Sequence, residues 1–147
     1  MAIVVQNQAP AVALDTSRVT SDLERAMTYL DCAEKELSLV LADDRLLHEL
    51  NRDYRFKDRP TNVLAFPQEP VSGSGPTTTL LGDVIVSLPT AAREAQDLDQ
   101  PVEARVLYLC LHGLLHLLGY DHEGEAGERD RMEALEQDLL LHLQTPG

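Results

Sequence analysis

The chain has 147 residues, of which 44% are hydrophobic. This length supports one domain with a substantial core and is short for two, so we expect a single domain over residues 1–147. The 25 acidic residues outnumber the 12 basic ones, and the net charge of −13 opposes nonspecific adhesion to nucleic acid, so no DNA partner is expected. A polyanionic ligand therefore requires a local basic patch.

The first half of the chain predicts strands and helices in alternation. A weakly alternating strand, IVVQNQ, precedes a helix that begins at Ser21. A second strand with leucines at period two spans residues 36–42. Asp43 and Asp44 then supply an N-cap for the next helix.

Two further strands are predicted in the middle of the chain. NVLAFP and LLGDVIVSLP are runs of strand-forming residues that end at Pro67 and Pro89. Residues 69–79 between them are rich in turn formers and have no periodicity, which predicts a mobile loop. A hairpin is therefore expected here.

Three helices are predicted after the last strand. Ser87 can cap the first, and the second runs from about Val102 to Leu118, where Gly119 stops it as a C′ glycine. The third is an amphipathic helix over residues 127–143. This order predicts an α+β fold with a small mixed β-sheet covered by several helices.

Neither the cysteines nor the apolar segments indicate an exported or membrane protein. Cys32 and Cys110 lie in apolar surroundings without a CxxC pair, so neither a disulfide framework nor a thiolate zinc site is predicted. The N-terminal segment lacks the charged and apolar regions of a signal peptide. Residues 106–120, the most apolar stretch, are shorter than the ~20 residues that span a bilayer. We expect a cytoplasmic protein with no membrane partner.

The segment HGLLHLLGYDH holds three of the five histidines. His112 and His116 lie four residues apart on the long helix, so their imidazoles share a face and can bind one metal ion. A turn at Gly119 allows His122 to approach the same point. A single buried histidine is usually structural, but three together favour a metal site on this helix and the turn after it. Arg105, seven residues before His112, lies on nearly the same stripe and is a candidate for substrate binding.

The same histidine spacing occurs in metzincin proteases, which carry a glutamate general base directly after the first histidine. Gly113 stands there instead, so peptide hydrolysis by the usual route is not expected. A glycine inside a helix costs about 1 kcal/mol relative to alanine and needs a packing or functional reason, the packing reason being close approach of a strand. Three imidazoles leave an open position on a tetrahedral ion, which suits water activation.

Four of the twelve basic residues fall within eight positions: Arg52, Arg55, Lys57 and Arg59. One interpretation is a solvated helix end, where cations are favourable. The other, which we favour, is a patch that binds the phosphates of a substrate. Arginine suits a phosphate-binding patch because its guanidinium makes two parallel hydrogen bonds to a phosphate and stabilises negative charge that develops on it.

Together these motifs resemble the bacterial YbeY family of rRNA maturation factors, metal-dependent endoribonucleases specific for single strands. The resemblance runs from ELSLVLADD through LNRDYRFKDRPTNVLAFP and LLGDVIVS to HGLLHLLGYDH and the acidic last helix. It implies that His112, His116 and His122 bind one ion, usually zinc, and that Arg55 is the functional arginine. It also implies 16S rRNA maturation and ribosome quality control, with ribosomal or ribosome-assembly proteins as partners.

Two residues depart from the family pattern. Phe56 stands where the family commonly has glycine in YRGKD, and Ala65 stands where LSF is usual. Phe56 can stack on a base or only stiffen the loop. Neither position is an expected metal ligand. We therefore expect the two changes to affect loop geometry and substrate preference.

The leading hypothesis is hydrolysis of single-stranded RNA by metal-activated water, with Arg55 holding the scissile phosphate. Asp121, a candidate catalytic residue, can serve as base or orient His122, and we favour the orienting role. One alternative is a metal-stabilised ribosome-assembly factor that cuts nothing. Another is a metal-dependent hydrolase of a different small substrate.

Overall fold

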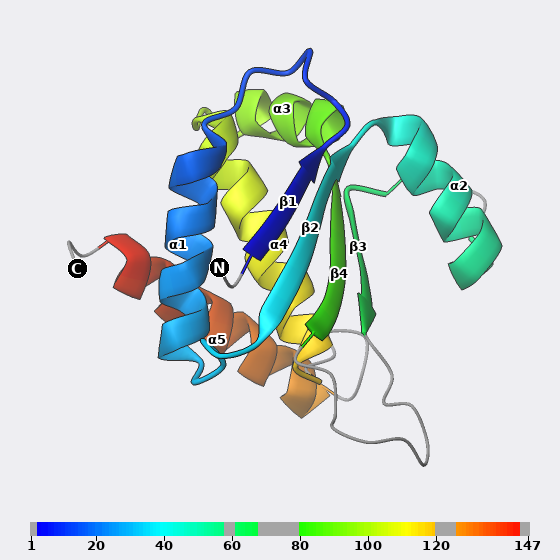
Figure 1. Ribbon diagram of the computed structural model, residues 1–147. Coiled ribbons are helices and arrows are strands. Elements are labelled where there is room, and N and C mark those ends of the chain that lie inside the picture. The colour runs from blue at the N-terminus through cyan, green and yellow to red at the C-terminus, as the bar shows by residue number, and fades with distance from the viewer. Residues whose placement is uncertain (1–2, 58–60, 68–79, 120–125, 145–147) are drawn as a thin grey trace.

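A computed structural model describes residues 3–57, 61–67, 80–119 and 126–144 of the chain. Within these ranges the strands and helices follow one another in the predicted order (Figure 1). They are β1 (Ile3–Asn7), α1 (Thr16–Tyr29), β2 (Glu36–Ala42), α2 (Asp44–Arg55), β3 (Val63–Pro67), β4 (Leu80–Ser87), α3 (Leu88–Asp97), α4 (Val102–Leu117) and α5 (Ala126–Gln144).

The four strands form one mixed sheet in the order β1-β2-β4-β3. β1, β2 and β4 run parallel, whereas β3 pairs antiparallel with β4, so that Leu64 lies opposite Ile85. The predicted α+β fold with a small mixed sheet is confirmed. The predicted loop at residues 69–79 lies outside the described residues.

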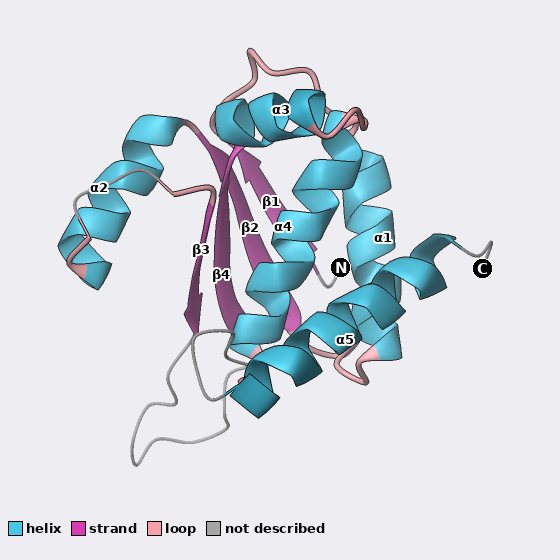
Figure 2. Cartoon of the chain, turned by 180° about the vertical axis from the view of Figure 1, so that it is seen from behind, coloured by secondary structure: helices cyan, strands magenta, loops and turns pink. Residues whose placement is uncertain are grey.

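Helices cover both faces of the sheet unequally (Figure 2). The main core lies where the inward leucines of β2 and the valines of β4 meet α1 and α4. α5 packs across α1 and α4. On the other face α2 buries Leu47 against Ala42, Leu64 and Ile85. Alternate residues of β4 thus enter different cores, which is why Val84, Ile85 and Val86 are apolar in succession.

The first helix begins earlier than predicted. It starts at Thr16 rather than Ser21, because the Asp15 side chain accepts a hydrogen bond from the Arg18 N–H as an N-cap. The added turn is polar except for Val19, which is buried in the main core. One apolar residue among five carries too little periodicity to reveal a helical turn.

The predicted N-caps of α2 and α3 and the predicted glycine after α4 are confirmed. Asp43 caps α2 by accepting from the Leu46 N–H at 3.0 Å, and Ser87 caps α3. Gly119 follows α4 with φ of 100°, a left-handed conformation that glycine adopts without strain. Asp44, at the start of α2, accepts hydrogen bonds from Ser87 and from Thr90 and Arg93 of α3. These bonds anchor one end of α2 and so position its other end, which carries Arg55.

Both cysteines are buried and unpaired, as predicted. Burial raises the pKa of the Cys110 thiol to about 12, so it remains a neutral core residue. None of the helices in the described ranges has the length and apolar character needed to cross a bilayer.

The glycine between the two helical histidines is explained by packing. A Cβ atom built on Gly113 would lie 2.8 Å from Cγ1 and 3.0 Å from Cγ2 of Val84. α4 therefore rests on β4 at a distance that only glycine permits, which confirms the packing explanation. A glutamate has no room at this position.

We expect Gly113→Ala to lower the free energy of unfolding by about 1–3 kcal/mol, because the added methyl overpacks the contact with Val84. Chemical denaturation of the apoprotein measures this change. The control is Gly127→Ala in α5, where an added Cβ meets nothing within 4 Å. A neutral Gly113→Ala, or a double variant with Val84→Ala that recovers nothing, would contradict the packing explanation.

Candidate active-site cleft

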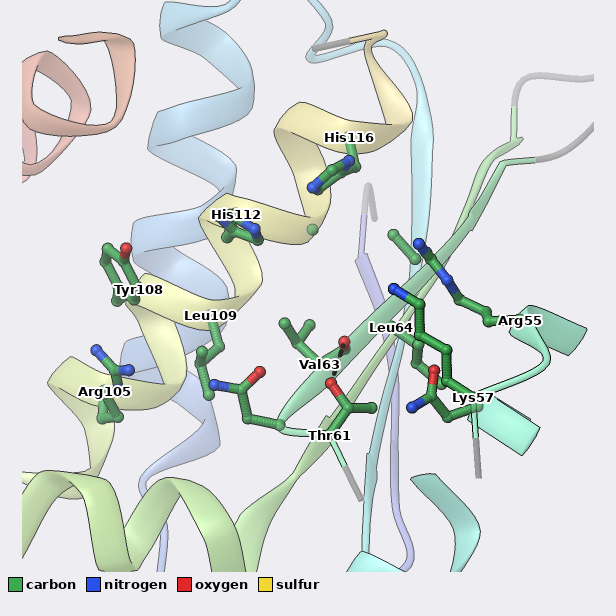
Figure 3. Close-up of a pocket in the computed structure, with 14 residues that line it drawn as sticks. Arg55, Lys57, Thr61, Val63, Leu64, Arg105, Tyr108, Leu109, His112 and His116 are labelled. Carbon is green, nitrogen blue, oxygen red and sulfur yellow. Dashed lines mark hydrogen bonds between the residues drawn. The ribbon is translucent and has the colours of Figure 1, made fainter. Parts of the chain in front are cut away.

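A cleft of about 320 Å³ opens between α4, β3 and the end of α2 (Figure 3). Its α4 wall is formed by residues spaced along one stripe of the helix, and the opposite wall by the strand and the helix end. The lining residues are Arg105, Tyr108, Leu109, His112, Gly113 and His116 of α4, residues 61–65 in and before β3, and Asn51, Arg55 and Lys57.

The two helical histidines lie together on the cleft wall. Their ring centroids are 4.9 Å apart and the ring planes are inclined by 67°. His112 Nδ1 lies 2.8 Å from Oε1 of Glu136, a residue of α5 whose side chain is only 6% exposed. When this ring nitrogen carries the proton and donates to the carboxylate, Nε2 is left as a lone-pair donor.

Glu136 also engages Tyr108. The Tyr108 ring stacks beside that of His112 with centroids 6.4 Å apart. Burial raises the pKa of the Tyr108 phenol, and the nearby carboxylate of Glu136 raises it further. The phenol therefore remains neutral, and one buried carboxylate acts on two side chains of α4.

Glu136 was missed by sequence reasoning, which considered only Asp121 as an orienting carboxylate. A signal was present in the pattern of α5. Met132, Glu136 and Leu139 follow one another at helical spacings of four and three, and all three are buried. A glutamate within an apolar stripe is rarely buried without a partner, so it indicates a specific interaction.

The predicted metal ligands are described only in part. His112 and His116 are brought together, whereas His122 and Asp121 lie outside the described residues. Consistent with this, no group of three His, Cys, Asp or Glu side chains able to hold a metal is found among the residues that the structure covers. The expected site needs His122 for its third ligand.

The basic segment contributes two cations to the cleft. Arg55 and Lys57 line it and extend from the end of α2 opposite His112 and His116 (Figure 3). Arg52 does not line the cleft, and its Nε lies 2.9 Å from the Asp53 carboxylate. Arg59 lies outside the described residues. Arg52 and Arg55 occupy the last turn of α2, so the helix-end interpretation is also correct for them.

Arg105 lines the cleft, but its charge is paired with that of Glu94. Its Nε lies 2.8 Å from Oε1 of Glu94, and its guanidinium lies 4.8 Å from the centre of the Tyr108 ring. The Glu94 carboxylate also accepts a hydrogen bond from Asn62 Nδ2 at 3.2 Å. These contacts join α3, α4 and the start of β3. They therefore fix the position of one wall of the cleft relative to the other.

The arrangement suits a phosphodiester. One wall presents two imidazoles, which can bind a divalent ion or exchange protons. The facing wall presents a guanidinium and an ammonium, which can hold anionic oxygens. Both walls line the same cleft.

Comparisons with known proteins agree with this chemistry. A family model described as Endoribonuclease YbeY matches residues 4–144. A protein named Endoribonuclease YbeY from Syntrophotalea carbinolica is 45% identical over 82% of this chain and 81% of its own length. One of the same name from Geobacter metallireducens is 39% identical over 100% of this chain and 99% of its own. The solution structure of a Thermotoga maritima protein shares the fold, with a TM-score of 0.63 at 23% identity over 96% of this chain and 88% of that one.

The protein is therefore an enzyme of the endoribonuclease class, a hydrolase that cuts within RNA chains. The chain belongs to the YbeY family of endoribonucleases. This membership favours the enzyme over a non-catalytic assembly factor.

Proposed function

We propose that this enzyme hydrolyses phosphodiesters of single-stranded RNA in the cleft between α4, β3 and α2. The observation that carries the proposal is the pair of imidazoles, His112 and His116, facing the cations Arg55 and Lys57. At about 320 Å³ the cleft is near the lower limit of small-ligand sites, which suits one strand rather than a duplex.

His112 and His116, together with His122, are proposed to hold one zinc ion. The donor set fits, because zinc takes neutral imidazole nitrogens and Glu136 engages the far nitrogen of His112, as carboxylates do for metal-binding histidines. When bound, such an ion supplies an acidified water molecule and polarises a phosphoryl oxygen. Asp121 is proposed to orient His122.

The side chains of the cleft divide the remaining work. Arg55 forks onto the scissile phosphate and stabilises the charge that builds up on its oxygens. Lys57 neutralises a phosphate beside it, and Arg52 and Arg59 extend the cationic surface outside the cleft. Arg105 also contacts the substrate. Its ion pair with Glu94 fixes the guanidinium over the Tyr108 ring.

The biological setting is proposed from the family resemblance. We place the enzyme in the cytoplasm, in 16S rRNA maturation and ribosome quality control, with ribosomal or ribosome-assembly proteins as partners. The acidic composition supports a selective role, since it leaves only a local surface able to attract RNA.

Arg55→Ala is expected to slow single-turnover cleavage of a single-stranded RNA by about 10²–10³-fold at saturating enzyme, because one donor to the developing phosphoryl charge is lost. The free energy of unfolding should change by no more than about 0.5 kcal/mol, since Arg55 is exposed. Rapid-quench kinetics and denaturation measure the two effects.

The matched control is Arg45→Ala, an exposed arginine in the first turn of the same helix whose partner is Glu49. Cleavage by this variant should equal that of the wild type. A wild-type rate for Arg55→Ala would refute the catalytic assignment. No cleavage of any single-stranded RNA by the zinc-loaded wild type would favour the assembly factor.

Replacing Glu136 should weaken metal binding. We expect Glu136→Leu to lower zinc affinity about 10–100-fold, because the proton on His112 Nδ1 loses its acceptor and the ring its orientation. Glu136→Gln keeps a carbonyl acceptor and should lose less. Competition with a chromophoric chelator measures affinity without any RNA.

Glu133→Gln serves as control for this pair, because Glu133 lies on α5 at an exposed position. Denaturation of the metal-free variants separates a loss of folding from a loss of ligand orientation. Wild-type zinc affinity in both Glu136 variants would show that the carboxylate serves the fold alone.

A further inference from the structure

Phe56 is placed where its side chain adds nothing to the fold. It is the C-cap of α2, in the left-handed region with φ of 59° and ψ of 32°, and it is 88% exposed. The L-configuration disfavours this region because Cβ crowds the following carbonyl oxygen. A phenylalanine here combines backbone strain with an apolar ring in water.

The turn itself needs only the backbone. The N–H groups of Phe56 and Lys57 both donate to the carbonyl oxygen of Asn51, which closes the helix in a left-handed cap. A glycine would close the same turn without strain. Within the part of the chain that the structure describes, the Phe56 ring has no aromatic partner, whereas Tyr54 two residues earlier contacts Phe66 edge-on at 5.7 Å.

The position of the ring suggests what it contacts. Phe56 stands between Arg55 and Lys57, which both line the cleft, while Phe56 itself lies outside the lining. The residue therefore stands at the rim of the cleft, next in the chain to the two cations proposed to hold phosphate, and its ring is exposed to solvent. Cations that follow a backbone with an exposed aromatic face next to them are the combination that binds single-stranded nucleic acid.

We propose that Phe56 is a stacking platform for an unpaired RNA base that flanks the phosphate held by Arg55 and Lys57. The inference rests on the proposed function, since it takes single-stranded RNA as the substrate. An apolar segment of a protein is the competing occupant, but the cations on both sides of Phe56 favour an anionic partner.

Stacking at this place has a consequence for substrate choice. Every base has a flat face, so the ring accepts any sequence. A base in a duplex is already stacked and paired, so it must be pulled out before it can reach Phe56. The platform therefore favours single strands over duplexes independently of the cleft's size.

A tryptophan reporter tests the contact directly. The chain contains no tryptophan, so Phe56→Trp introduces a single indole. Stopped-flow mixing of the zinc-loaded variant with a single-stranded oligoribonucleotide should quench its fluorescence before cleavage. An abasic oligonucleotide of equal length, or an RNA duplex, should leave the fluorescence nearly unchanged.

Two substitutions then separate stacking from strain. Phe56→Gly removes both ring and strain, so it should melt at the same or a higher temperature yet bind single-stranded RNA roughly 5–30-fold more weakly, as expected for one lost stacking contact. Phe56→Leu keeps the strain and an apolar side chain but should also bind weakly. Binding of the abasic oligonucleotide should not change in either variant.

Asp99→Gly is the matched backbone control, because Asp99 is also left-handed, with φ of 55°, and lies beyond the end of α3. It should bind RNA like the wild type. Wild-type RNA affinity in Phe56→Gly, or equal losses for abasic and normal RNA, would overturn the stacking proposal alone. A wild-type protein that neither binds nor cuts single-stranded RNA would overturn the proposed function as well.

Discussion

The close contact between Gly113 of α4 and Val84 of β4 sets the geometry of the cleft. Because Gly113 has no side chain, the backbone of α4 packs directly on the Val84 side chain, and His112 and His116 on either side of Gly113 face the space beside β3. A longer residue at 113 would lift the helix and carry both imidazoles with it. The same contact excludes the glutamate that metzincin proteases use as a base. Residue 113 therefore determines both how closely α4 packs on β4 and which general base is absent.

Three separate anchors bring the other cleft residues to this helix. Asp44 ties the start of α2 to α3, and the end of α2 and the turn after it then carry Arg55 and Lys57 opposite the histidines. Glu94 joins Arg105 of α4 to Asn62 before β3. Glu136 reaches from α5 to His112. Each anchor is a carboxylate shielded in part from water, where charge-assisted hydrogen bonds are stronger than at the open surface.

The electrostatics of the protein concentrate attraction in a small area. With a net charge of −13, most of the surface repels a polyanion, and the cations at the end of α2 are gathered where the imidazoles face them. The base-stacking role proposed for Phe56 belongs to the same area, where the residue has a left-handed backbone.

The sequence by itself determined the elements, their order and the α+β class, because periodicity, proline stops and capping residues are local signals. It also placed His112 and His116 on one helical face and picked out four neighbouring cations, of which the structure places Arg55 and Lys57 in the cleft. The early start of α1 escaped it, since Asp15 and one buried valine carry little periodicity. Only the tertiary structure decided that Glu136 supports His112, that Arg105 is shared with Glu94, and that Gly113 is required by Val84. These pairings join residues 11 to 29 positions apart on different elements, so a local pattern can indicate that a residue is buried, but only the folded chain determines its partner.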